Sequence, residues 1–201
     1  MQQTAPARDV RQQILDTAQT IISGKGFSAV GLNEILAAAR IPKGSFYHYF
    51  SSKDAFGEAL LESYFRHYLE ALDAMLQRPG LNGAERLMLY WQRWADTQAT
   101  SDPEGKCLAV KLGAEVADLS EAMRGALVRG TAGVIERLAQ AIERGVADGS
   151  VVVDAQAPHV AETLYQTWLG ASLRAKITRN ADPLLSALAA TRRSLGLSPA
   201  A

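Results

Sequence analysis

A short aromatic segment at residues 41–53 limits the possible folds of this chain more than any other feature. Its sequence is IPKGSFYHYFSSK, which is too short to form a stable helix in isolation. Phe46 and Phe50 are four residues apart, so in a helix they share one face and can point into a core. Lys43 and Tyr47 then face outward. A short helix fixed by two phenylalanines, with donors and a cation on its outer side, is suited to a DNA groove.

The residues before this segment predict a partner helix. Leu32, Ile35, Leu36 and Ala39 recur at helical spacing. A brief link separates them from Pro42, which fits the first turn of a new helix. Two short helices with a tight connection form a helix-turn-helix.

This part of the chain resembles the DNA-binding domain of the TetR repressor family. The resemblance is carried by Gly26 and Phe27, by residues 32–35 (LNEI), and by residues 41–53, which match the pattern K-G-x-[LF]-Y-x-[HY]-F-x-[SN]-K. One departure is Val30-Gly31, where the family often has threonines that cap the second helix and hold a phosphate. Backbone N–H groups would have to make that contact here.

The resemblance implies an all-α, TetR-like fold of about nine helices. A three-helix, helix-turn-helix DNA-binding domain is expected at residues 1–53, followed by a helical sensing and dimerisation domain at residues 54–201. In this family the last two long helices form the four-helix bundle of a homodimer.

Hydrophobic periodicity also predicts helices throughout the chain and no sheet. The helix at about 120–149 is expected to break near Gly130. Residues 151–153 are three valines with strand propensity, but no partner strand is predicted, so we expect an extended loop. The other helices outside the helix-turn-helix are expected at about 8–23, 54–77, 83–100, 106–117, 158–179 and 183–195.

The outward-facing residues of the helix-turn-helix are the candidate DNA contacts. Lys43 can bond to guanine O6 and N7 or to a phosphate, and Asn33 can reach a base or a phosphate. Gly44 lets the start of the helix approach the DNA closely. His48 lies where the family reads bases, so it either reads one here or is simply exposed. The residues better placed for phosphates, which fix register without reading sequence, are Ser45, Tyr47, Tyr49 and Lys53.

Charge gives weaker support for this assignment. The chain has 21 basic and 21 acidic residues and no formal net charge. Residues 1–53 contain six lysines and arginines against three acidic residues, so this part carries +3 and the remainder −3. A basic end is consistent with a DNA-facing domain. No apolar run reaches the ~18–20 residues that a membrane span needs, and no signal peptide opens the chain, so we expect a cytoplasmic protein.

Cys107 is the single cysteine, which excludes an intrachain disulfide. It follows Gly105-Lys106 at a predicted helix start, where oriented N–H groups and the lysine would favour the thiolate. The alternative is a buried, unreactive cysteine that packs beside Leu108.

A second resemblance favours the reactive alternative. Residues 105–124 and 168–177 are similar to the branch of the TetR family named for the N-ethylmaleimide reductase repressor. That branch responds to reactive electrophiles and oxidants through a cysteine at this position, and a lysine that matches Lys176 is its partner. The other cysteines of the branch are missing here, so any sensor must work through one sulfur per chain. Lys176 could equally be a solvated cation near a helix end.

Aromatic residues in the second half suggest a pocket or a core. Tyr90, Trp94, Tyr165 and Trp168 could line a ligand cavity, although aromatics at helical spacing more often form a core. His67 and His159 lack partner ligands at suitable spacing, so no metal or cofactor is expected. A thiol hydrolase built on Cys107 and His159 has no support from spacing.

These observations predict a homodimeric TetR-family repressor that binds a palindromic operator in double-stranded DNA. Small electrophiles or oxidants would release it through Cys107. The first alternative is release by a noncovalent ligand in the C-terminal pocket. The second is an architectural DNA-binding or adaptor protein with no sensing function.

Overall fold

The computed structural model describes residues 10–99 and 107–198. Within these ranges the chain forms nine α-helices and no strand, which confirms the predicted all-α class. The helices are α1 (Val10–Lys25), α2 (Leu32–Ala39), α3 (Lys43–Tyr49), α4 (Lys53–Leu76), α5 (Gly83–Ala99), α6 (Leu108–Leu119), α7 (Glu121–Ala147), α8 (Ala157–Thr178) and α9 (Asp182–Ser194).

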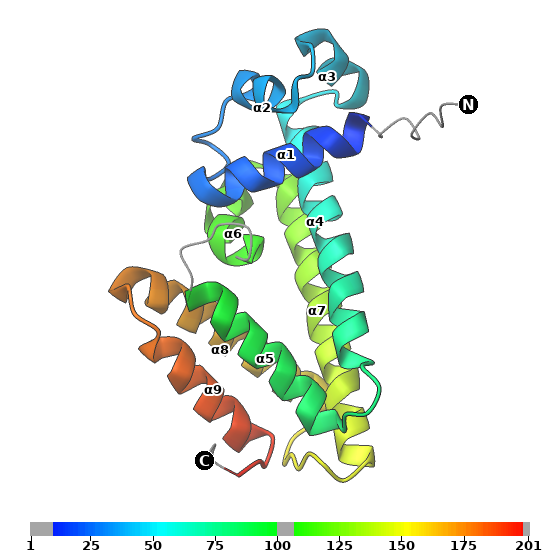
Figure 1. Cartoon of the computed structure of the whole chain (residues 1–201), viewed down its shortest axis with the longest axis vertical. Coiled ribbons are helices and arrows are strands. Elements are labelled where there is room, and N and C mark those ends of the chain that lie inside the picture. Colours follow the sequence, from blue (N-terminus) through cyan, green and yellow to red (C-terminus); the bar gives the residue numbers. More distant parts are fainter. Residues whose placement is uncertain (1–9, 100–106, 199–201) are drawn as a thin grey trace, which may run out of the picture.

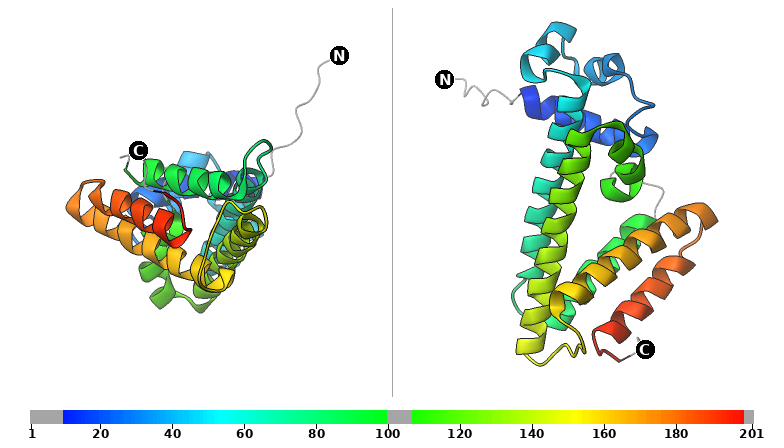
Figure 2. Two further views of the ribbon diagram at one scale, coloured as in Figure 1. Left: turned by 90° about the horizontal axis from the view of Figure 1, so that it is seen from below. Right: turned by 180° about the vertical axis from the view of Figure 1, so that it is seen from behind.

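The helices build an elongated molecule with a small head at one end (Figure 1). Helices α1, α2 and α3 form the head, and α6 lies directly beneath α1. The two longest helices, α4 and α7, run side by side from the head to the opposite end, where they meet α5 and α8 (Figure 2). Helix α9 packs on α8 and α5. The first and last parts of α4 therefore belong to different ends of the molecule.

Two hydrophobic cores follow from this layout. The core at the head combines apolar residues of α1–α3 with the first half of α4, all of α6 and the start of α7. The other core joins the end of α4 to α5, α8, α9 and the rest of α7. Because the head core draws on α4, α6 and α7, the head is not packed separately from the rest of the chain. The division between residues 53 and 54 remains a prediction.

The expected break near Gly130 is wrong, because α7 is continuous from Glu121 to Ala147. Glycine weakens a helix by its flexibility, but Gly130 has a packing role here. A Cβ atom at this position would lie 2.1 Å from a ring carbon of Phe65 on α4. The glycine therefore lets α4 and α7 approach closely, and their packing keeps the helix intact.

The segment at 151–153 is extended and unpaired as a strand, as predicted. Val151 is buried, and the Val152 N–H donates to the carbonyl of Leu195 at 3.0 Å. This contact fixes the loop after α7 against the end of α9.

Candidate DNA-binding helix and cysteine pocket

Two phenylalanines anchor α3 to the head, as the spacing predicts. Phe46 is fully buried and Phe50 is almost so. Their ring centroids are 5.1 Å apart, and that of Phe46 is 5.4 Å from Phe56 at the start of α4. The α3 helix is only seven residues long, so this aromatic cluster, rather than helix propensity, holds it in place.

The turn before α3 is defined by backbone geometry. Arg40 caps α2 in the left-handed conformation, with φ of 58°, and the Ile41 N–H donates to the Leu36 carbonyl at 2.9 Å. The side chain of Gln13 donates from α1 to the carbonyl of Ala39 at 3.0 Å. Together these bonds hold α2 and α3 in a fixed helix-turn-helix.

The predicted DNA contacts lie largely on the outer side of this unit. Lys53 is exposed, but its Nζ donates to the Val30 carbonyl at 3.4 Å and lies 5.0 Å from the centroid of the Phe27 ring. To reach a phosphate it would have to leave these partners. Ser45 is half-buried; the exposed candidates are Asn33, Lys43, Gly44, Tyr47, His48 and Tyr49.

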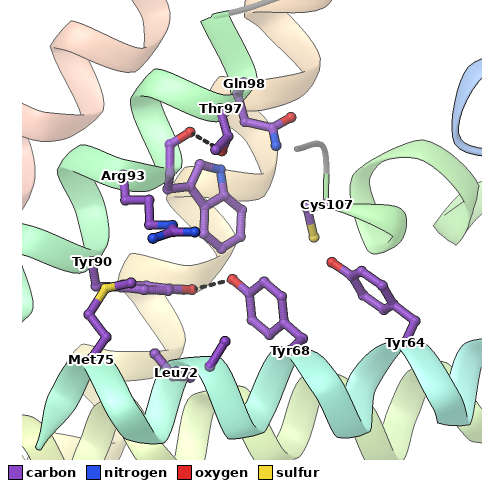
Figure 3. Close-up of a pocket in the computed structure, with 11 residues that line it drawn as sticks. Tyr64, Tyr68, Leu72, Met75, Tyr90, Arg93, Thr97, Gln98 and Cys107 are labelled. Atoms are coloured by element: carbon purple, nitrogen blue, oxygen red, sulfur yellow. Dashed lines mark hydrogen bonds between the residues drawn. The ribbon is translucent and has the colours of Figure 1, made fainter. Parts of the chain in front are cut away.

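Cys107 lies directly before α6, at the N-cap position. Only 6% of the residue is exposed. The N–H of the next residue, Leu108, donates to the Tyr64 hydroxyl at 3.2 Å. The thiol points toward Tyr64 and Tyr68, which project from consecutive turns of α4 (Figure 3).

The thiol opens into a pocket of about 220 Å³ between α4 and α5. The hydroxyl groups of Tyr68 and Tyr90 form a hydrogen bond across it, with 2.9 Å between the two oxygens (Figure 3). Arg93 brings a cation to the pocket, and no hydrogen bond or ion pair joins it to another residue in the described ranges. The remaining lining residues are Tyr64, Ala71, Leu72, Met75, Trp94, Thr97, Gln98 and Cys107.

Burial of Cys107 outweighs the expected stabilisation of the thiolate by backbone N–H groups. Burial raises the pKa of the Cys107 thiol, and hydrogen bonds with the Val110 backbone, the Tyr64 hydroxyl and the Ala109 backbone offset only part of that effect. Lys106, the expected neighbouring cation, lies outside the described residues. The thiol form therefore predominates at neutral pH.

A pH dependence follows from this shift. Since the thiolate is the nucleophile, we expect the rate of alkylation of Cys107 by N-ethylmaleimide to rise about tenfold per pH unit. The rise should continue above about pH 8.5, where a free thiol begins to level off. Intact-mass time courses measure the rate, with N-acetylcysteine in the same buffers as control. A plateau near neutral pH would contradict the raised pKa.

Two of the four aromatic residues proposed for a pocket line it, and the other two do not. Tyr90 and Trp94 line it, whereas Tyr165 and Trp168 do not. Trp168 is fully buried, stacks on Trp91 with centroids 5.0 Å apart, and donates from Nε1 to Thr191 at 2.9 Å. The Tyr165 ring packs edge-on against the ring of Trp94, with centroids 5.8 Å apart. These two residues belong to the core.

Lys176 is exposed in the last turn of α8, and its pairing with Cys107 remains a prediction. Across residues 10–99 and 107–198 no group of acidic, histidine and cysteine side chains could hold a metal ion. In those same ranges no helix is long and apolar enough to cross a bilayer.

Comparison with known proteins decides the family. The DNA-binding pattern described as "Bacterial regulatory proteins, tetR family" matches residues 14–60. The pattern "Tetracyclin repressor-like, C-terminal domain" matches residues 83–191, more than half of the chain. The chain belongs to the TetR family. Both the helix-turn-helix head and the helical body are therefore those of a TetR-family regulator.

Among TetR-family members, the chain is 42% identical over 181 residues to the transcriptional repressor NemR of Escherichia coli (strain K12), which covers 90% of this chain and 91% of NemR. It is 37% identical over 179 residues to the transcriptional regulator AcuR of Cereibacter sphaeroides, covering 87% and 80% of the two chains. The crystal structure of E. coli NemR in its reduced form superposes with a TM-score of 0.88 at 41% identity, over 96% of this chain and all of that one. These relatives are transcriptional regulators rather than enzymes, and they confirm the resemblance to the NemR branch.

Proposed function

We propose that this TetR-family repressor binds a near-palindromic operator as a homodimer and leaves it when a reactive electrophile or oxidant modifies Cys107. The proposal divides the chain into a DNA-binding domain at residues 1–53 and a sensing and dimerisation domain at residues 54–201. Its place of action is the bacterial cytoplasm, where operator DNA lies.

The exposed side of α3 supports the DNA-binding half of the proposal. Lys43 is the first residue of the helix, so its ammonium group extends from the end that would enter the major groove. Asn33 on α2, together with His48, would supply further base or phosphate contacts. Gly44 has no atom within 4 Å of where a Cβ would lie, which leaves its backbone open to close approach. Ser45, Tyr47, Tyr49 and Lys53 would contact phosphates.

An apolar stripe on the last two helices supports the homodimer. Leu173 and Ile177 are four residues apart on α8, and Leu185 lies on the adjacent α9; each is more than half exposed. Exposed aliphatic residues on neighbouring helices are typical of an interface. Pairing α8 and α9 with a second copy would cover them and hold two heads about one helical turn of DNA apart.

The position of Cys107 supports the sensing half. Its sulfur is the only thiol and faces a pocket that a small molecule can enter. With an α,β-unsaturated carbonyl compound, the thiol would lose its proton and its sulfur would bond to the β-carbon. The electron pair of the carbon–carbon π bond moves to the α-carbon, which takes up a proton. Because the residue is buried, an adduct would have to displace Tyr64 or the start of α6. Lys176 would assist only if it reaches the sulfur.

One observation favours noncovalent release as a second candidate. The pocket contains a cation, Arg93, and phenol hydroxyls above an apolar floor of Leu72 and Met75. Such a pocket fits a small, flat compound with an electronegative end. Trp94 and Tyr90 would supply its aromatic wall.

Lys43→Ala tests the DNA-binding assignment. If Lys43 bonds to a guanine, operator affinity should fall by about 1–3 kcal/mol and discrimination against random duplex should fall with it. An equal loss on both duplexes, with a salt slope smaller by about one, would assign Lys43 to a phosphate. Fluorescence anisotropy with duplexes from the gene's own upstream region provides the measurement.

The matched control for this variant is Arg144→Ala. Arg144 is exposed in the last turn of α7, at the end of the molecule remote from α3 (Figure 1). It should leave both affinities unchanged. If Lys43→Ala binds both duplexes as the wild type does, α3 is not the DNA-reading helix.

A further inference from the structure

Two side chains of helix α6 form hydrogen bonds with the backbone at the end of α1 and in the loop that joins α1 to α2. The two carboxylate oxygens of Glu115 accept hydrogen bonds from successive backbone N–H groups, at 3.2 Å from Phe27 and 2.6 Å from Ser28. The Nζ of Lys111 donates to the carbonyl of Gly24 at 3.0 Å. Lys111 and Glu115 are four residues apart, so they lie on the same face of α6.

The loop is shaped to receive this carboxylate. Gly26 has φ of +95°, a conformation that favours glycine. A Cβ there would lie 3.1 Å from Oε2 of Glu115. Partial burial raises the pKa of Glu115, but the hydrogen bonds from Ser28 and Phe27 outweigh it and hold the pKa below its usual value. Bonds from N–H groups to an ionised carboxylate are among the stronger hydrogen bonds in proteins.

The start of the same helix carries Cys107, the proposed sensing residue. Cys107 caps α6, and eight residues separate it from Glu115, or about 12 Å along the helix axis. Leu108, Leu112 and Val116 are buried along one face of α6 and belong to the same hydrophobic core as α1–α3, so a displacement of the start of α6 would disturb its packing against the head. Figure 1 shows α6 lying between the head and the rest of the molecule.

We propose that Glu115 is a positioning residue that transmits modification of Cys107 to the DNA-binding head, with Lys111 as its accessory. A displaced α6 carries the carboxylate with it and pulls on the loop that leads into α2. This inference rests on the proposed sensing function of Cys107. It assigns the link between Cys107 and the head to the side chains of Glu115 and Lys111.

The test compares the wild type with its variants in how strongly alkylation of Cys107 changes operator affinity. Operator Kd is measured by anisotropy for protein before and after full alkylation by N-ethylmaleimide, verified by intact mass. In the wild type we expect the alkylated form to bind at least about tenfold more weakly, within the usual range of allosteric coupling. In Glu115→Ala the ratio of the two Kd values should fall to less than about twofold, while Cys107 is still alkylated. Glu115→Gln keeps one acceptor oxygen and should give an intermediate ratio.

Asp118→Ala is the matched control, since Asp118 is an exposed carboxylate on α6 with no hydrogen bond to a described residue. It should keep the wild-type ratio. If Glu115 only stabilises the fold, Glu115→Ala lowers the melting temperature but leaves the ratio intact, and the transmission role is overturned. If the wild type itself shows a ratio of one, the sensing function fails and the transmission role fails with it.

Discussion

Replacing Phe46 with alanine is expected to destabilise the protein by about 3–5 kcal/mol. The side chain is fully buried and touches the rings of Phe50 and Phe56. Its removal leaves a cavity beneath a helix that is too short to persist without that anchor. Since domains are stable by only about 5–15 kcal/mol, much of the folding free energy is lost. Operator binding should disappear with it.

Tyr47→Ala is the control for this prediction. Tyr47 is the next residue on α3 and is 58% exposed, so its loss should cost less than about 1 kcal/mol. Urea denaturation followed by circular dichroism gives both values, at one protein concentration because a dimer's stability depends on it. Equal destabilisation by the two variants would mean that Phe46 does not anchor the helix.

Replacing Cys107 with serine should abolish release from the operator and leave binding intact. Serine is nearly the same size, and it is a favoured N-cap residue, so it suits the position that Cys107 occupies at the start of α6. It lacks the thiolate that electrophiles attack. Shifting a repressor population from 99% to 1% in the DNA-binding conformation takes about 5.5 kcal/mol. In the variant, treatment with an electrophile should cause no such shift.

Ser23→Ala is the control for substituting a small buried polar residue elsewhere in the chain. Ser23 is buried in α1, and among the described residues its hydroxyl donates only to the Gln19 carbonyl within its own helix. This variant should bind the operator and release it as the wild type does. Anisotropy titrations with N-ethylmaleimide or a quinone measure both properties.

The helix-turn-helix was predictable because its signals are local. The spacing of Phe46 and Phe50 places both side chains on one face whatever the rest of the chain does. The same is true of the apolar residues of α2, of which Ile35, Leu36 and Ala39 are buried. Local patterns of this kind determine where helices begin and which side is buried.

Features that depend on tertiary packing were not predictable. Glycine propensity suggested a break at Gly130, but contact with Phe65 across α4 and α7 decides the outcome. The position of Cys107 at a helix start suggested a lowered pKa, but burial of the thiol raises it. Local sequence patterns predict the backbone near each residue, but they do not predict the contacts and burial that come from helices distant in sequence.

The pocket and the contact of α6 with the head were missed for the same reason. Tyr64 and Tyr68 belong to the apolar stripe of α4 by spacing, and only the fold turns the Tyr64 hydroxyl toward Cys107 and the Tyr68 hydroxyl toward Tyr90 (Figure 3). Glu115 and its loop partners are 87 and 88 residues apart in sequence, so no periodicity connects them.

One measurement tests the central claim most directly. Wild-type protein bound to its operator is titrated with N-ethylmaleimide, and each sample is divided between anisotropy and intact-mass analysis. We predict that the fraction released equals the fraction of chains, or of dimers, that carry one adduct on Cys107, and that Cys107→Ser stays bound at every dose. Release of Cys107→Ser at the wild-type dose, or full alkylation of the wild type without release, would contradict the account.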